Sequence, residues 1–102
     1  MTFDKKRALK MIAQQNKEII RKFEYEHPDC RDVIESAAKA CIENFWYKEG
    51  GVRTTYNADS KDEVSTEEIE RYIHALGFNL TNKVEYMYDD SGCKFIIKFN
   101  IN

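Results

Sequence analysis

The stretch KVEYMYDDSGCKFIIKFNIN (residues 83–102) holds two runs of alternating apolar and polar residues around an Asp-Asp-Ser-Gly turn. This alternation is typical of strands with one buried face, and the turn predicts an antiparallel hairpin. The two apolar faces coincide only if the loop has an even number of residues, because a one-residue slip inverts every side chain. Apolar matching selects one register: Tyr88 opposite Phe95, Tyr86 opposite Ile97, and Val84 opposite Phe99. The same register pairs opposite charges: Glu85 with Lys98, and Asp89 with Lys94.

A lone hairpin is marginal in water, so its aromatic face needs a cover. Residues 28–49 predict a helix that stops at Gly50-Gly51. Its apolar residues spread over an arc of about 220°, wider than a surface helix needs. They are Cys30, Val33, Ile34, Ala37, Ala38, Cys41, Ile42, Phe45 and Trp46. We expect this central helix to cover Tyr86, Ile97 and Phe99 of the hairpin.

Residues 4–24 predict a single amphipathic helix before the central one. Asn16 interrupts its apolar stripe and needs either a hydrogen-bond partner or access to water. Pro28 ends this helix, since the residue before a proline avoids the helical region, and Asp29 is the expected cap of the next helix.

The sequence predicts a short strand at residues 52–56 (VRTTY), which are β-branched and aromatic. Ser65 and Glu68 form a capping box that opens a third helix, and Gly77 can end that helix in a left-handed turn. Together the elements predict one α+β domain over residues 1–102, in the order ααβαββ. Its helices pack on one face of a small antiparallel sheet with a C-terminal hairpin.

The composition indicates an ordinary globule: of 102 residues, 42% are hydrophobic and 33% are charged. Three cysteines without a CxxC pair favour a reducing compartment. The first residues contain no long apolar run, so we expect a cytoplasmic protein that does not enter a membrane. The net charge of −2 is unevenly distributed. Residues 1–22 carry seven basic and two acidic residues, whereas the remaining residues carry nine basic and sixteen acidic ones.

No catalytic or metal-binding pattern stands out. His27 precedes Cys30 by three residues, but Cys30 falls on the apolar arc of its helix, where a thiol is usually inert. A cluster of His27, Asp29, Cys30 and Asp32 lacks a second ligand pair with zinc-site spacing. A calcium loop starting at residue 57 would have a lysine at its fifth position, which excludes it. We therefore expect a protein that is not an enzyme and uses no metal or cofactor.

Two charged surfaces are candidate binding sites, although each is also compatible with an ordinary solvated face. The basic stripe lies on the first predicted helix and could follow a phosphate backbone; it consists of Lys6, Lys10, Lys17 and Arg21. The acidic set could occupy a basic groove of a partner; it consists of Asp59, Asp62, Glu63, Glu67, Glu68, Glu70, Asp89 and Asp90. Met87 and Ile96 are expected opposite each other on the outer face of the hairpin, where a partner or the chain itself could cover them.

The segments STEEIERYIHALGF (residues 65–78) and KVEYMYDDSGCKFIIKF (residues 83–99) resemble small accessory proteins of phages and mobile elements, including anti-CRISPR inhibitors. The resemblance implies a non-enzymatic protein-binding module that works in a host cell's cytoplasm. Its acidic set would engage the basic groove of a host nucleic-acid-handling effector of the CRISPR type. The alternative is a small nucleic-acid-binding accessory protein that uses the basic stripe. The oligomeric state stays open.

Overall fold

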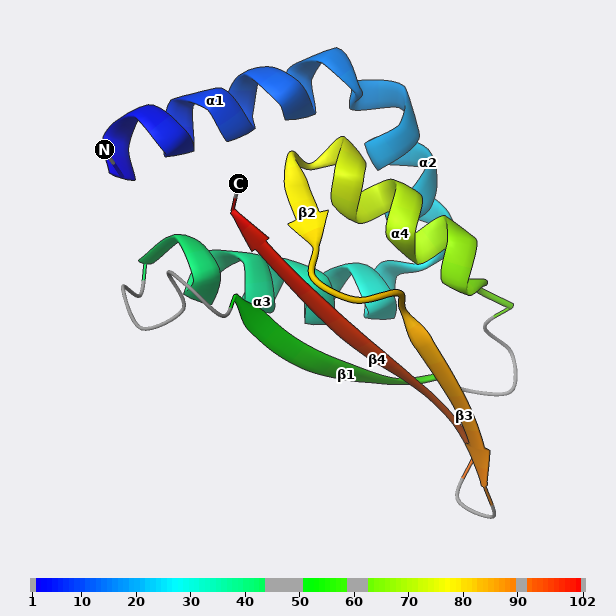
Figure 1. The fold of residues 1–102 in the computed structure, drawn as a ribbon. Helices are drawn as coiled ribbons and strands as arrows, with labels where there is room; N and C mark the ends of the chain where they lie inside the picture. The colour runs from blue at the N-terminus through cyan, green and yellow to red at the C-terminus, as the bar shows by residue number, and fades with distance from the viewer. Residues whose placement is uncertain (1, 44–50, 59–62, 90–91, 102) are drawn as a thin grey trace.

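The computed structural model describes residues 2–43, 51–58, 63–89 and 92–101, without the side chains of residues 2–6 and 89. The elements follow one another as α1 (Thr2–Gln15), α2 (Lys17–Glu26), α3 (Pro28–Glu43), β1 (Val52–Ala58), α4 (Thr66–Ala75), β2 (Phe78–Leu80), β3 (Glu85–Asp89) and β4 (Gly92–Ile101). Helices gather on one side of an antiparallel sheet, and the β3–β4 hairpin closes the order (Figure 1). The predicted α+β class is confirmed, with two more elements than expected.

The first of these additions is a break in the helix predicted over residues 4–24. Asn16 separates α1 from α2 with φ −109° and ψ 25°. Its side-chain amide donates to the carbonyl of Ile12 at 2.9 Å and to that of Ala75, at the end of α4, at 3.4 Å. The single-helix prediction was therefore wrong, because the polar residue in the apolar stripe finds its partner by bending the chain onto α4.

Helix α3 begins at Pro28, so Asp29 lies in its first turn and does not cap it. Proline suits the first helical position, because its missing N–H would have no partner there and its φ is already helical. The predicted end of this helix near Glu49, with Phe45 and Trp46, lies outside the described residues.

Strand β4 is the centre of the sheet. It pairs with β1 along one edge, where Val52 lies opposite Phe99 and Tyr56 opposite Phe95. Along the other edge it pairs first with β3 and then with β2, the second element that the sequence did not predict. The sheet is thus at most three strands wide at any point along β4.

The hairpin register differs from the predicted one by two residues. Tyr86 lies opposite Phe95, and Tyr88 lies opposite Cys93. The predicted sharing of faces is correct because a shift of two keeps every side chain on its face. The predicted partners on the outer face are wrong: Glu85 lies opposite Ile96, Met87 opposite Lys94 and Asp89 opposite Gly92. The reason is β2: Leu80 occupies the position opposite Phe99 that the prediction gave to Val84.

The core lies between the helices and the inner face of the sheet. Phe95, Ile97 and Phe99 are buried there, together with Ile34 of α3. The ring of Phe78 meets that of Phe99 edge-on at 5.0 Å. The expected burial is therefore confirmed for Ile97 and Phe99.

Helix α4 begins and ends as predicted. The amide of Glu68 donates to the Ser65 hydroxyl at 3.1 Å, and the amide of Ser65 donates to the Glu68 carboxylate at 3.1 Å, so the capping box is complete. Gly77 follows the helix with φ 98°, a conformation that favours glycine.

Candidate functional site

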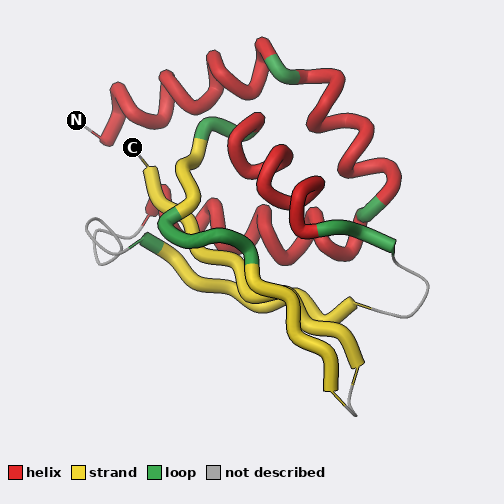
Figure 2. The backbone as a smooth tube through the Cα atoms, turned by 45° about the vertical axis from the view of Figure 1, so that its right-hand side comes forward, coloured by secondary structure: helices red, strands yellow, loops and turns green. Residues whose placement is uncertain are grey.

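The far end of the β3–β4 hairpin extends beyond the helices (Figures 1 and 2). Three consecutive side chains of β3 are largely exposed there: Tyr86 at 52%, Met87 at 50% and Tyr88 at 76%. Alternation places the two tyrosines on the inner face of the sheet and Met87 on the outer face. We name these three residues, together with Cys93 opposite Tyr88, the hairpin end. The prediction that Tyr86 is covered by α3 was wrong, because the helix layer stops short of it.

An aromatic row anchors the hairpin end to the core. The ring of Tyr86 meets that of Phe95 at 5.1 Å, edge to face, and Phe95 stacks on Tyr56 at 6.3 Å. The Tyr86 hydroxyl lies 3.0 Å from the Cys93 sulfur, a contact that raises the pKa of Tyr86. Tyr86 therefore packs against a buried ring, since Phe95 is only 2% exposed.

The acidic set does not form one free surface in the described part of the chain. Glu63 and Glu67 are exposed. Glu68 belongs to the capping box, and Glu70 accepts a hydrogen bond from the amide of Val84 at 3.0 Å. Both of these carboxylates therefore have structural roles. Asp89 is the last residue of β3, and the others, Asp59, Asp62 and Asp90, lie outside the described residues.

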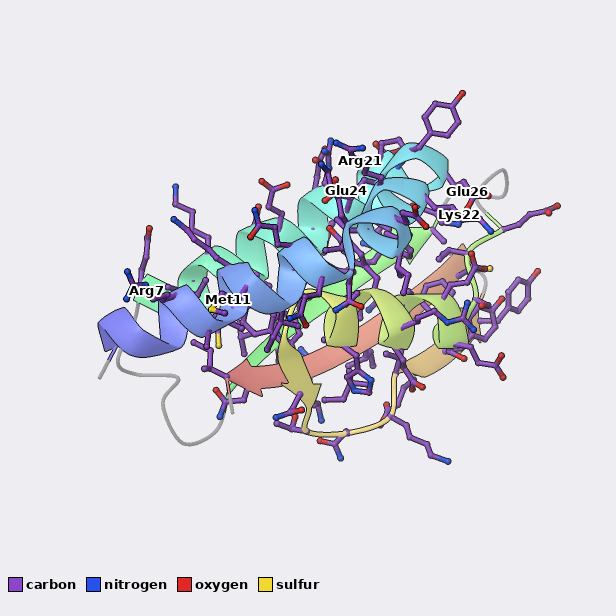
Figure 3. The ribbon with its side chains drawn as sticks, turned by 90° about the horizontal axis from the view of Figure 1, so that it is seen from above. Arg7, Met11, Arg21, Lys22, Glu24 and Glu26 are labelled. Carbon is purple, nitrogen blue, oxygen red and sulfur yellow. The ribbon has the colours of Figure 1, made fainter. Side chains whose placement is uncertain are left out.

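The basic stripe is divided between two helices. Lys6 and Lys10 lie on α1, whereas Lys17 and Arg21 lie on α2, after the break at Asn16. The side chains of Lys10, Lys17 and Arg21 are exposed. Figure 3 shows α1 and α2 following each other, with Arg21 and Glu24 on the same side of α2. The straight row of four cations that one helix would present is therefore interrupted.

A groove of about 620 Å³ lies between α1 and α3, over the end of α4. Its floor is mainly apolar and includes Leu9, Ala38, Leu76 and Phe78. At one end the Tyr72 hydroxyl donates to the Glu24 carboxylate at 2.9 Å. The groove is of ligand size, but its rim carries both signs of charge, including Lys39 and Glu43, and so indicates no particular occupant.

Two juxtapositions could not be found from sequence spacing. Arg53 lies directly opposite Lys98 across β1 and β4, and Lys94 lies four residues before Lys98 on the same outer face. His27 faces Glu68, which is 41 residues distant in the chain, with 3.2 Å between Nε2 and the carboxylate oxygen Oε2. Only the strand register reveals the first pair, and only the packing of α4 against α2 brings the second together.

Comparisons with protein-family models, with curated proteins and with solved structures find no match. Function is therefore inferred from the residues themselves. Within the ranges that the structure describes, none of the helices combines the length and the apolar character that crossing a membrane requires.

Proposed function

We propose that this chain is a non-enzymatic protein-binding module and that the hairpin end is its contact surface. The observation that carries the proposal is the exposure of Tyr86, Met87 and Tyr88, each by half or more, beyond the helix layer. Contiguous exposed apolar surface on a small domain usually marks an interaction site. Tyrosine supplies large contact area at a small cost in side-chain entropy, and it is enriched among residues that dominate binding energy.

Charge around the hairpin end favours a protein partner that has an apolar cleft with a basic rim. Glu85 precedes Tyr86 and is exposed, and Asp89 and Asp90 follow Tyr88 in the sequence; these three acidic residues outnumber the exposed Lys94, which lies opposite Met87. Acidic residues beside an apolar contact steer association toward a basic surface and suppress other partners. A nucleic-acid-handling effector would present such a basic groove, so the proposed partner is a host effector of this kind, and the proposed role is its inhibition.

The test compares variants of a tagged chain in capture experiments with lysate of the host cell. The double variant Tyr86→Ser/Tyr88→Ser should lose the captured partner by about tenfold or more, since residues at the centre of an interface contribute about 2 kcal/mol or more each. Raising the salt concentration should release the same protein from the wild-type chain, because its rim is basic.

Tyr25→Ser is the matched control, because Tyr25 is 88% exposed on α2, in a different element. This variant should retain the partner. Equal loss with both variants, or full retention with the double variant, would exclude the hairpin end as the contact surface.

The second candidate is a small nucleic-acid-binding accessory protein. It is favoured by the exposure of Lys10, Lys17 and Arg21, and by the like charges of Arg53 and Lys98 lying opposite each other, where an anion would relieve their repulsion. The chain should then be retained on immobilised DNA at ~50 mM salt. Loss of this retention when Lys10, Lys17 and Arg21 are replaced by glutamine would support this candidate against the first.

A further inference from the structure

Three potential metal ligands meet where α2 ends, α3 begins and α4 begins. Glu26 is the last residue of α2, His27 connects α2 to α3, and Glu68 lies in the first turn of α4. One ligand atom from each of them lies within 4.8 Å of the other two. His27 Nε2 and Glu68 Oε2 lie 3.2 Å apart. The donor atoms are therefore close enough to converge on one ion after small side-chain rotations.

The imidazole is held in place by packing. His27 is only 8% exposed, and its ring lies 5.2 Å from that of Phe23. Phe23 in turn stacks on Tyr72 at 4.2 Å, which joins this contact to the core. A ligand whose orientation is fixed before binding loses little entropy when it coordinates an ion.

The Glu68 carboxylate is also oriented, and the oxygen that faces His27 is not the one that completes the capping box. Oε1 accepts the hydrogen bond from the Ser65 amide, whereas Oε2 faces His27. Partial burial favours a higher pKa for Glu68, but hydrogen bonds from His27 and Ser65 outweigh it and lower the pKa below its usual value. Glu26 is exposed, so its side chain can turn toward an incoming ion.

We propose that Glu26, His27 and Glu68 bind a divalent transition-metal ion of the Zn²⁺ class. One imidazole and two carboxylates are ligands that Zn²⁺ accepts, and three protein ligands leave one tetrahedral position for water. Coordination requires the neutral imidazole with its hydrogen on Nδ1, so that the Nε2 lone pair faces the ion, and the ion takes the place of the direct hydrogen bond to Glu68. Mg²⁺ and Ca²⁺ are disfavoured, because they prefer six or more oxygen ligands.

Without metal, the hydrogen bond between His27 and Glu68 already satisfies both groups, so an ion has to compete with it. The ammonium group of Lys22 also competes with an ion, in this case for the carboxylate of Glu26. Lys22 lies four residues before Glu26 on α2, and Figure 3 shows the two side chains on the same side of the helix. Replacing Lys22 with alanine removes a positive charge near the ion and should therefore strengthen metal binding.

The experiment titrates the full chain with Zn²⁺ in a calorimeter and with Co²⁺ by visible absorption. We expect one ion per chain, and at least a tenfold loss of affinity in Glu26→Gln and in Glu68→Gln. The glutamine at residue 68 can still accept from the Ser65 amide, so this variant should keep the fold, which circular dichroism will verify. Lys22→Ala should bind at least as tightly as the wild type.

The controls separate this site from other ligands on the chain. His74→Ala and Glu67→Gln change exposed residues of α4 and should leave the affinity unchanged. Cys93→Ser removes a half-buried free thiol and should do the same. The proposal fails if millimolar Zn²⁺ does not bind, or if binding persists unchanged in both glutamine variants.

Discussion

Tyr72 illustrates how one polar atom joins two helices inside the core. The residue is 1% exposed, and its hydroxyl donates to Glu24 of α2 at 2.9 Å. Burial and the neighbouring carboxylate both raise the pKa of Tyr72 above its ordinary value of 10.0, because each disfavours the phenolate. The fold therefore depends on this phenol staying protonated.

This dependence predicts that the free energy of unfolding falls at alkaline pH. The substitution Tyr72→Phe should make that fall smaller. The folded pKa is higher than the unfolded one, so the contribution of Tyr72 is complete below pH 10 and declines as pH rises from there toward the folded pKa. Each pH unit in that range should cost up to about 1.4 kcal/mol. Tyr72→Phe should unfold about 0.5–1.5 kcal/mol more easily at neutral pH, with a shallower decline above pH 10.

Urea unfolding at several pH values measures both quantities. Tyr86 also has a raised pKa, so the difference between wild type and variant is the quantity to compare. An unchanged alkaline decline in Tyr72→Phe would contradict the predicted role of the hydroxyl.

At the scale of elements, the pairing of β1 with β4 depends on a close approach of two backbones. Gly51 precedes β1 with φ 73°, and a Cβ atom added to it would overlap the carbonyl oxygen of Phe99. Phe99 is buried at the centre of the sheet and opposite Val52, so it cannot move away easily. A glycine is thus required here both for its conformation and for its size.

Gly51→Ala is expected to destabilise the protein more than Gly92→Ala. Gly92 also has a positive φ, 119°, but a Cβ atom there would meet nothing within 4 Å. Gly92→Ala, the control, should lower the free energy of unfolding by about 1–2 kcal/mol, for the backbone conformation alone. The Gly51 variant should lose roughly 1–3 kcal/mol more for overpacking. If thermal or urea unfolding shows the same loss of stability in both variants, the close contact with Phe99 makes no contribution to the effect of Gly51→Ala.

The elements also show which features a sequence can predict. The capping box at Ser65 and Glu68 depends on residues three apart, and the alternation in β4 depends on neighbours two apart, so both can be read locally. The hairpin register depends on what else pairs with β4, and no local signal reveals that Leu80 lies opposite Phe99. The break at Asn16 is visible as a polar interruption, but its partner, Ala75, is 59 residues away.

For the whole molecule, the decisive feature is that the sheet is longer than the helix layer that covers it. The chain measures 44 × 30 × 18 Å, and the hairpin end extends beyond the helices (Figure 2). The hydrophobic pattern alone makes Tyr86 and Tyr88 look like core residues. Their exposure follows only from the relative lengths of the sheet and the helices, which the sequence does not specify.

This difference in length predicts very unequal effects of substitutions on one face of the hairpin. Tyr86→Ser/Tyr88→Ser should change the free energy of unfolding by about 1 kcal/mol or less, because both rings are more than half exposed. Phe95→Ala should cost about 3–5 kcal/mol, because its ring is buried. Urea unfolding of both variants tests the prediction. A loss of several kcal/mol in the tyrosine variant would place those rings in the core.

The central position of β4 has a consequence for how the protein is made. Residues 52–58, 78–80 and 85–89 leave the ribosome before residues 92–101, which are the shared hydrogen-bonding partner of all three earlier strands. Until that strand emerges, Val52 and Tyr56 have no neighbour in a sheet, and the nascent chain can form only its helices. The sheet therefore closes cooperatively only after β4 has emerged, and a nascent chain stopped before β4 would leave its strands without a common partner and exposed to aggregation.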